Sequence, residues 1–179
     1  MANLIIYILG LILLLITLTA AASIIFSVLS FAPWVPSRAR DLKRIFKLAG
    51  LKPGQIFYDL GCGNGRVAVY AADNCEAKAI GLEICLPLYL VCKLREIFRR
   101  GKNIKFKLKN LYKENLAGAD VVYFFGMPHR LNAGFKRKLA AELKPGAKVI
   151  SYSFKFDDWK PAAIDKPSDN DLPIYLYVI

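Results

Sequence analysis

Residues 57–66 read FYDLGCGNGR, an apolar strand that runs into an acidic residue and then into Gly61, Gly63 and Gly65. Glycines let the backbone turn sharply and approach a ligand at a place where any Cβ would clash. In open α/β sheets, ligands bind outside the carboxyl ends of the strands. The stretch therefore predicts the first strand of such a sheet and the turn at its binding edge.

The glycine spacing separates two classes of cofactor. The dinucleotide fingerprint G-x-G-x-x-G needs its third glycine at the position of Arg66. A pyrophosphate uses a helix N-terminus, whereas a carboxylate before the glycines, here Asp59, suits a ligand that carries an amino group. We therefore expect S-adenosylmethionine rather than NAD, with cofactor contacts from Asp59, Gly61, Cys62 and Gly63.

Three later strand ends add candidate site residues. Glu83 ends the second predicted strand, where a carboxylate can accept both ribose hydroxyls, and Ile84 is expected against the adenine. The third strand ends at Asn110 and Leu111, an amide for the adenine edge and an apolar side chain for its face. The fourth ends at residues 125–128, beside the place where a reactive methyl group would point.

Strand and helix patterns alternate along the rest of the chain, which predicts a Rossmann-like, doubly wound and mostly parallel sheet covered by helices on both faces. Residues 173–179 are expected to add an antiparallel edge strand, and residues 155–172 to form one long loop. The predicted strands are 55–60, 77–83, 104–109, 120–126 and 148–154, and the predicted helices are 37–49, 65–72, 87–100 and 130–143.

The first 37 residues carry no charged side chain, and residues 4–31 are almost entirely apolar. About 20 such residues are enough to cross a hydrocarbon core. A cleaved signal peptide is the alternative, since residues 19–23 are small; however, no basic residue precedes the apolar run, which continues past them. We expect a transmembrane anchor over residues 1–36 and a catalytic domain over residues 37–179.

Basic residues begin directly after the apolar segment, and the positive-inside rule then places the domain in the cytoplasm, tethered to the cell inner membrane by a single pass. Trp34 is expected to anchor at the membrane interface. The net charge of +12 lies on the remaining residues, which predicts attraction to anionic lipid. Nucleic acid is the competing partner, but no recognised nucleic-acid motif is present.

Other reactive residues indicate no further site. The four cysteines form no C-x-x-C pair and a single histidine accompanies them, so neither a metal centre nor a disulfide framework is expected. His129 follows a proline at a predicted helix start and is interpreted as a surface or capping residue. Tyr112 and Tyr123 are interpreted as core, and Ser37 as a helix cap.

The chain resembles class I methyltransferases, and in particular the small membrane-anchored protein-lysine methyltransferases of the ATP synthase c-subunit and the adenine nucleotide translocase, with their prokaryotic relatives. The resemblance covers nearly the whole chain. It is carried by PWVP at residues 33–36, DLGCGNGR at 59–66, FGMP at 125–128 and FKFDDWKP at 154–161. It implies S-adenosylmethionine as the methyl donor and a lysine of a membrane-associated protein as the acceptor.

The resemblance also suggests an acceptor channel. We expect Phe125, Pro128 and Trp159 to form an aromatic passage that favours a deprotonated lysine, with Asp157 or Asp158 steering the incoming ammonium.

The sequence departs from the family pattern at four positions. Ser and Asp are usual at the positions of Cys62 and Asn64, and Asn-Pro is usual where Cys85 and Leu86 follow. The altered second pair leaves open the methylation of an amine-bearing lipid or small molecule. A third interpretation, from a non-enzyme class, is a cofactor-binding assembly factor that transfers no methyl group.

Overall fold

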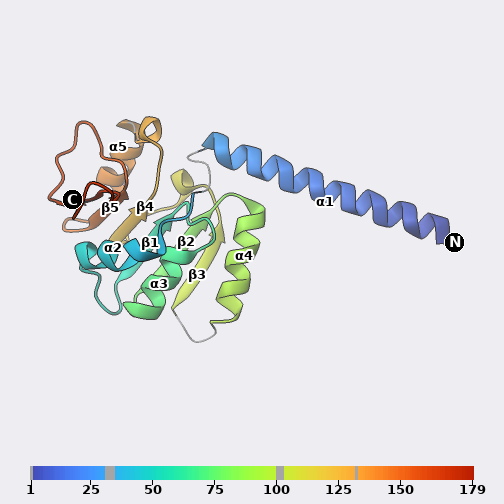
Figure 1. Ribbon diagram of the computed structural model, residues 1–179, viewed down its shortest axis with the longest axis horizontal. Helices are drawn as coiled ribbons and strands as arrows, with labels where there is room; N and C mark the ends of the chain where they lie inside the picture. Colours follow the sequence, from blue (N-terminus) through green and yellow to red (C-terminus); the bar gives the residue numbers. More distant parts are fainter. Residues whose placement is uncertain (1, 31–34, 100–102, 132) are drawn as a thin grey trace.

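We describe the fold from a computed structural model, which covers residues 2–30, 35–99, 103–131 and 133–179 (Figure 1). Its core is a seven-stranded sheet in the order β3-β2-β1-β4-β5-β7-β6. The strands are β1 (Ile56–Leu60), β2 (Lys78–Glu83), β3 (Ile104–Leu108), β4 (Val121–Phe124), β5 (Lys148–Tyr152), β6 (Ala163–Asp165) and β7 (Ile174–Val178).

The first five strands run parallel, and the strand order reverses at β1, which pairs with β2 on one side and β4 on the other. Asp59 lies opposite Gly81 on β2 and opposite Tyr123 on β4. Such a reversal is the place where open α/β sheets bind their ligands. The predicted doubly wound architecture is therefore confirmed, with the quoted stretch at its switch point.

Helices cover both faces of the sheet (Figure 1). The helices α2 (Leu42–Ala49), α3 (Arg66–Asn74) and α4 (Leu86–Ile97) pack on one face, and α5 (Ala133–Glu142) packs on the other. The amphipathic pattern of α2 explains its place, because its four buried residues are spaced along one side. Gly50 ends α2 in the left-handed conformation, with φ of +55°.

The last strand differs from its prediction in one respect. β7 is antiparallel to β5, as expected, but β6 pairs with its far side, so β7 is not the edge of the sheet. The expected loop of residues 155–172 contains β6. A strand of three residues is too short to show an alternating pattern, and a distant side chain supports it: Arg44 Nε donates to Asp165 Oδ1 at 2.7 Å.

Helix α1 (Ala2–Ser30) projects away from the domain (Figure 1). Its residues Asn3–Ile25 are long and apolar enough to cross a membrane, and none of its most apolar window is buried against the protein. A hydrogen bond links it to the domain, from the Leu86 backbone N–H to Ser23 Oγ at 2.7 Å. The predicted interfacial residue Trp34 lies outside the described residues.

Candidate functional site

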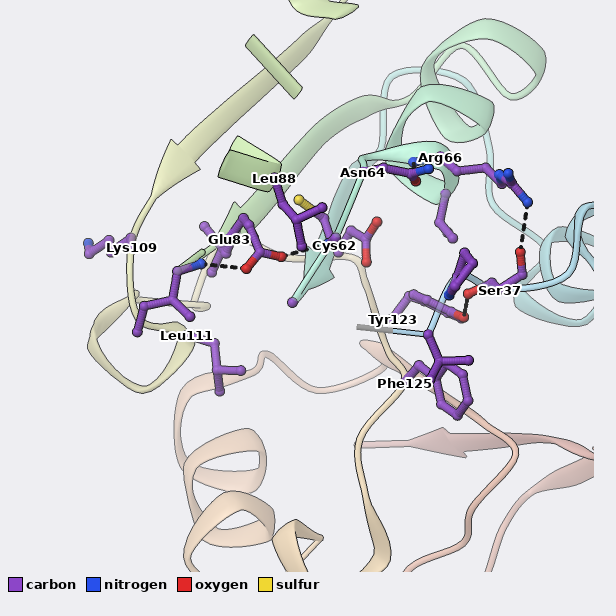
Figure 2. A pocket seen from close by; sticks show the side chains of 18 of the residues that line it. Ser37, Cys62, Asn64, Arg66, Glu83, Leu88, Lys109, Leu111, Tyr123 and Phe125 are labelled. Carbon is purple, nitrogen blue, oxygen red and sulfur yellow. Dashed lines mark hydrogen bonds between the residues drawn. The ribbon is translucent and has the colours of Figure 1, made fainter. Parts of the chain in front are cut away.

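A cavity of about 830 Å³, open to solvent, lies at the carboxyl ends of β1 to β4 (Figure 2). All eight cofactor contacts expected from the sequence line the cavity. They are Asp59, Gly61, Cys62, Gly63, Glu83, Ile84, Asn110 and Leu111.

Asp59 supplies a buried carboxyl group at one wall of the cavity. Its side chain is 1% exposed, and Oδ2 accepts a hydrogen bond from Ala68 N–H at 3.2 Å. Burial raises the pKa of Asp59 to about 8, and the charge of Glu83 acts in the same direction. A neighbouring cation would favour the ionised form. The environment of Asp59 therefore fits the amino group of a ligand.

The Glu83 carboxylate ties the glycine turn to the end of β2. Its Oε2 accepts from Gly63 N–H at 2.7 Å, and its Oε1 accepts from the N–H groups of Ile84 and Cys85, each at 2.8 Å. Burial raises the pKa of Glu83, and these three N–H groups oppose the shift. A carboxylate has about four acceptor positions, so with three N–H donors in place about one position remains for a hydroxyl donor such as that of a ribose.

The glycines of the turn serve two different purposes. Gly61 has φ of +79°, and a Cβ built on it would meet nothing within 4 Å, so the space beside it belongs to the cavity. Gly65 has φ of +76°, but its Cβ would lie 2.6 Å from Phe106 Cζ and 3.0 Å from Cys92 Sγ. The expectation of close ligand approach therefore suits Gly61, whereas Gly65 permits packing within the protein.

The half of the cavity that contains Asp59 and Glu83 has an apolar end. Leu111 is buried at the start of the 3₁₀ turn η2 (Leu111–Lys113), and Ile84 and Leu88 contribute apolar surface from the β2–α4 connection and from α4. Asn110 caps η2, because its Oδ1 accepts from Tyr112 N–H at 2.9 Å. These residues offer a flat apolar slot with an amide at its edge, which suits a purine ring.

The other half of the cavity contains residues that the sequence did not reveal. Ser37 Oγ and Tyr123 Oη form a buried hydrogen bond of 2.6 Å, and Arg66 Nη1 donates to the Ser37 carbonyl oxygen at 3.2 Å (Figure 2). Ser37 thus caps no helix, and Tyr123 borders the cavity as well as the core. Burial raises the pKa of Tyr123 well above its usual value, so its hydroxyl stays neutral.

A sequence signal for this wall existed. Val35 and Pro36, the end of the PWVP motif, also line the cavity, so the segment that leaves the apolar helix contributes directly to the site.

The structure places the five expected acceptor-channel residues in different environments. Phe125 lines the cavity and packs edge-on against Tyr152, with ring centroids 5.0 Å apart. Pro128 begins the exposed 3₁₀ turn η3 (Pro128–Arg130) and is not part of the cavity lining. Asp157 is exposed, and Asp158 Oδ2 accepts from Lys136 Nζ at 2.8 Å.

Trp159, expected to form a channel with Phe125 and Pro128, does not line the cavity. The Trp159 ring packs against Phe156 and Tyr177, at centroid distances of 5.2 and 4.8 Å. These rings belong to the core cluster on the α5 face of the sheet, whereas Phe125 packs against the cluster on the opposite face. Tyr152 at the end of β5 belongs to the cluster that Phe125 packs against, whereas Phe154, Phe156 and Trp159 lie against the cluster on the α5 face.

The thiols beside the cavity are free. Cys62 and Cys92 are buried with their Sγ atoms 3.9 Å apart, and Cys92 Sγ donates to the Gly63 carbonyl oxygen at 3.1 Å. Across the described ranges, no group of three or more His, Cys, Asp or Glu side chains could hold a metal ion.

A buried carboxylate before a glycine turn, a second carboxylate at the next strand end and an apolar slot at the third together define a Rossmann-like methyltransferase. Residues 59–163 match the family described as the ANTKMT methyltransferase domain. A protein-lysine N-methyltransferase of Saccharolobus islandicus strain REY15A is 33% identical over 152 residues, which cover 82% of this chain and 93% of that protein. The chain belongs to this methyltransferase family.

Two further proteins are similar over most of the chain. The ATP synthase c-subunit lysine N-methyltransferase of Rattus norvegicus is 31% identical over 131 residues, or 72% of this chain, and the match spans 59% of that longer protein. The crystal structure of an RNA methyltransferase from Salinibacter ruber, in complex with S-adenosyl-L-homocysteine, superposes with a TM-score of 0.74 at 26% identity and covers 81% of this chain and 94% of the other. S-adenosylmethionine is the cofactor, as the glycine spacing predicted.

Proposed function

We propose that this chain is a membrane-tethered protein-lysine N-methyltransferase whose acceptor lies in or at the same membrane. The observation that carries the proposal is the cavity itself, in which the cofactor-type half is continuous with a wall of Ser37, Tyr123 and Phe125 beside Arg66. The archaeal and rat relatives named above are lysine methyltransferases, which supports a lysine as the acceptor.

Each chemical group of the cofactor is assigned to cavity residues of matching chemistry. Asp59 would bind the amino group of the cofactor, and Glu83 would bind its ribose hydroxyls. The slot of Ile84, Leu88 and Leu111 would hold the adenine. Gly61 has no side chain and leaves space for the cofactor to approach the backbone. When bound, S-adenosylmethionine supplies an electrophilic methyl group. Charge complementarity at Asp59 and apolar contact at Leu111 orient the two ends of the ligand, and positioning is the main requirement of a displacement reaction.

The acceptor half favours a neutral amine. An aromatic, largely desolvated wall lowers the pKa of an ammonium group, because burial disfavours the charged form. The hydroxyls of Ser37 and Tyr123 can accept a hydrogen bond from an amine N–H, which orients the nitrogen and leaves its lone pair free. Phe125 borders the same wall and restricts access to it. We assign orientation of the acceptor nitrogen to these three residues.

Acidic side chains outside the cavity would act at longer range. We retain Asp157 and Asp158 as residues that attract a lysine side chain, and Asp157 is the stronger candidate because Lys136 already neutralises Asp158. Trp159 supports the position of this segment through its contacts with Phe156 and Tyr177. Pro128 is exposed and follows Phe125 closely in the sequence. We retain it as a residue that contacts the acceptor protein outside the cavity.

We propose that residues 1–36 are a single-pass anchor and that residues 37–179 form the catalytic domain on the cytoplasmic face of the cell inner membrane. The length and composition of α1 and the basic residues that follow it support this topology. A tether raises the effective concentration of enzyme and acceptor, so weak contacts with the acceptor can suffice.

The test uses the full chain with native membranes and S-adenosylmethionine labelled in its methyl group. We expect label in protein, released as methyl-lysine after hydrolysis, and none with a Glu83→Ala variant. Label that stays in organic-soluble lipid after protease treatment would support the amine-lipid alternative instead. Cofactor binding by calorimetry without transfer to any fraction would support the assembly-factor alternative.

A further inference from the structure

The outer side of α4 is apolar and exposed. Leu86, Leu90, Leu94 and Phe98 follow one another at four-residue spacing, which places them along one side of a helix. They are 36%, 53%, 56% and 83% exposed, and Val91 and Ile97 widen the stripe at 40% and 50%. We call these six residues the α4 apolar face.

Helix α4 buries fewer of its residues than α2 and α3, which pack on the same face of the sheet. Within α4, all of which the structure describes, only Cys92 is buried, whereas α2 and α3 bury four and five residues in stretches of 8 and 9. A contiguous apolar surface on a helix indicates that something covers it, because monomeric soluble proteins rarely leave such patches in water. The α4 apolar face therefore marks an interaction surface.

The position of α1 identifies what lies opposite this surface. Leu86, at the start of the face, donates its backbone N–H to Ser23 Oγ of α1. Figure 1 shows that α1 projects from the side of the domain on which α4 lies and that α4 runs across the line of α1. If α1 crosses a bilayer, α4 then runs along the bilayer surface.

The charge around the face is positive, as is needed to bind an anionic surface. Residues 86–109 contain eight Lys or Arg residues, and the carboxylates paired with four of them, from Glu96, Asp73 and Glu114, still leave an excess of positive charge. Interfacial helices combine Leu and Phe on one side with Lys and Arg beside them, and each cation near an anionic bilayer contributes about 1 kcal/mol. A second protein with an apolar groove would not by itself explain this charge.

We propose that the α4 apolar face is inserted into the headgroup region of the anionic bilayer that α1 crosses. This inference rests on the membrane tether in the proposed function. The inference also limits which proteins can be acceptors. Leu88, on the inner side of the same helix, lines the cavity, so a docked α4 holds the cavity beside the bilayer surface. The methylated lysine then belongs to a segment at the membrane surface rather than to a distant soluble domain.

The test places a fluorescent probe on the face in the full chain, reconstituted in anionic liposomes with brominated acyl chains. Phe98→Trp reports on the face, and Ile164→Trp is the matched control, because Ile164 is 57% exposed on β6 at the opposite edge of the sheet. Signals are taken as differences from the unaltered chain. We expect brominated lipid to quench the probe at 98 about twofold and to leave the probe at 164 unchanged, since interfacial helices insert 5–10 Å deep.

Flotation of the same samples tests the membrane tether separately from the docking of α4. A chain that does not float with liposomes contradicts the tether itself. A chain that floats, but whose probe at 98 is reached by aqueous iodide and not by bromine, contradicts α4 docking alone. Protection from both quenchers with cross-linking between copies would show that a second chain covers the face, and this also contradicts docking.

A second pair of variants tests the consequence for catalysis. Leu94→Asp combined with Phe98→Asp changes only exposed positions, so we expect cofactor affinity to stay within about twofold of the unaltered chain while the KM for a membrane-embedded acceptor rises about tenfold. Ile164→Asp should change neither. An unchanged KM in the double variant would overturn the proposed link between docking and acceptor position.

Discussion

The cofactor half and the acceptor half of the cavity are formed by different kinds of sequence segment. At the ends of β1, β2 and β3, every side chain expected to contact the cofactor lines the cavity. At the ends of β4 and β5, Phe125 does so, but Trp159 packs on the α5 face and Asp158 pairs with Lys136. Cofactor recognition follows from short local patterns, whereas acceptor recognition depends on segments brought together from distant parts of the chain.

Sequence separation explains the difference. Asp59 and the glycine turn lie within seven residues, and Glu83 reaches Gly63 across 20. The Ser37–Tyr123 hydrogen bond joins residues 86 positions apart. A motif can specify the first arrangement, but the second requires the sheet order and the exit of α1 to be known.

The strongest test of the cofactor half is Glu83→Ala. The change removes an ionised acceptor for ribose and leaves the N–H groups of Gly63, Ile84 and Cys85 without it. Hydrogen bonds to charged groups contribute about 1.5–3 kcal/mol each, so we expect cofactor affinity by calorimetry to fall about 100-fold or more. The matched control is Glu142→Ala, which removes a carboxylate bonded to Leu116 N–H outside the cavity. Equal losses in both variants would contradict the assignment.

The next largest effect compares two glycines of one turn. Gly65→Ala should lower the free energy of unfolding by about 3 kcal/mol, from an unfavourable φ and from overlap with Phe106. Gly61→Ala carries a similar φ but no clash, so about 1 kcal/mol is expected together with a loss of cofactor binding. Denaturant unfolding and calorimetry measure the two. Equal destabilisation would show that packing does not distinguish them.

The acceptor half is tested by Tyr123→Phe against Trp159→Phe. Removing the Tyr123 hydroxyl takes away one hydrogen bond of about 1 kcal/mol, and we expect kcat to fall about five- to tenfold with unchanged cofactor affinity. Trp159→Phe preserves a ring against Phe156 and Tyr177 and should leave kcat within about twofold. A larger loss for Trp159→Phe would restore Trp159 to the acceptor channel.

The smallest expected effect is a pH dependence of cofactor affinity. Burial raises the pKa of Asp59 to about 8, so most free enzyme holds this carboxyl protonated at pH 7 and half does at pH 8. A ligand amino group binds the ionised form, and affinity should therefore rise about fivefold from pH 7 to pH 8. Calorimetry at the two pH values measures the change. An Asp59→Asn variant should show no such rise in affinity. If its affinity still rises between pH 7 and pH 8, the titrating group is not Asp59.

The same contrast describes what sequence can predict of this fold. The parallel strands and their helices were predicted because apolar runs and glycine turns recur along residues 55–152. β6 was not, because three residues show no period and its partner Arg44 is 121 positions away. Tyr123 was interpreted as core on hydrophobicity alone, and its position opposite Asp59 becomes visible only when the strand register is known.

The Glu83 carboxylate has a kinetic consequence. It holds Gly63 in place through protein hydrogen bonds alone, so the turn already has its shape before any ligand arrives. A ligand that enters a site with this geometry loses little additional chain entropy on binding. Capture of the cofactor should then be limited by diffusion and desolvation rather than by loop ordering.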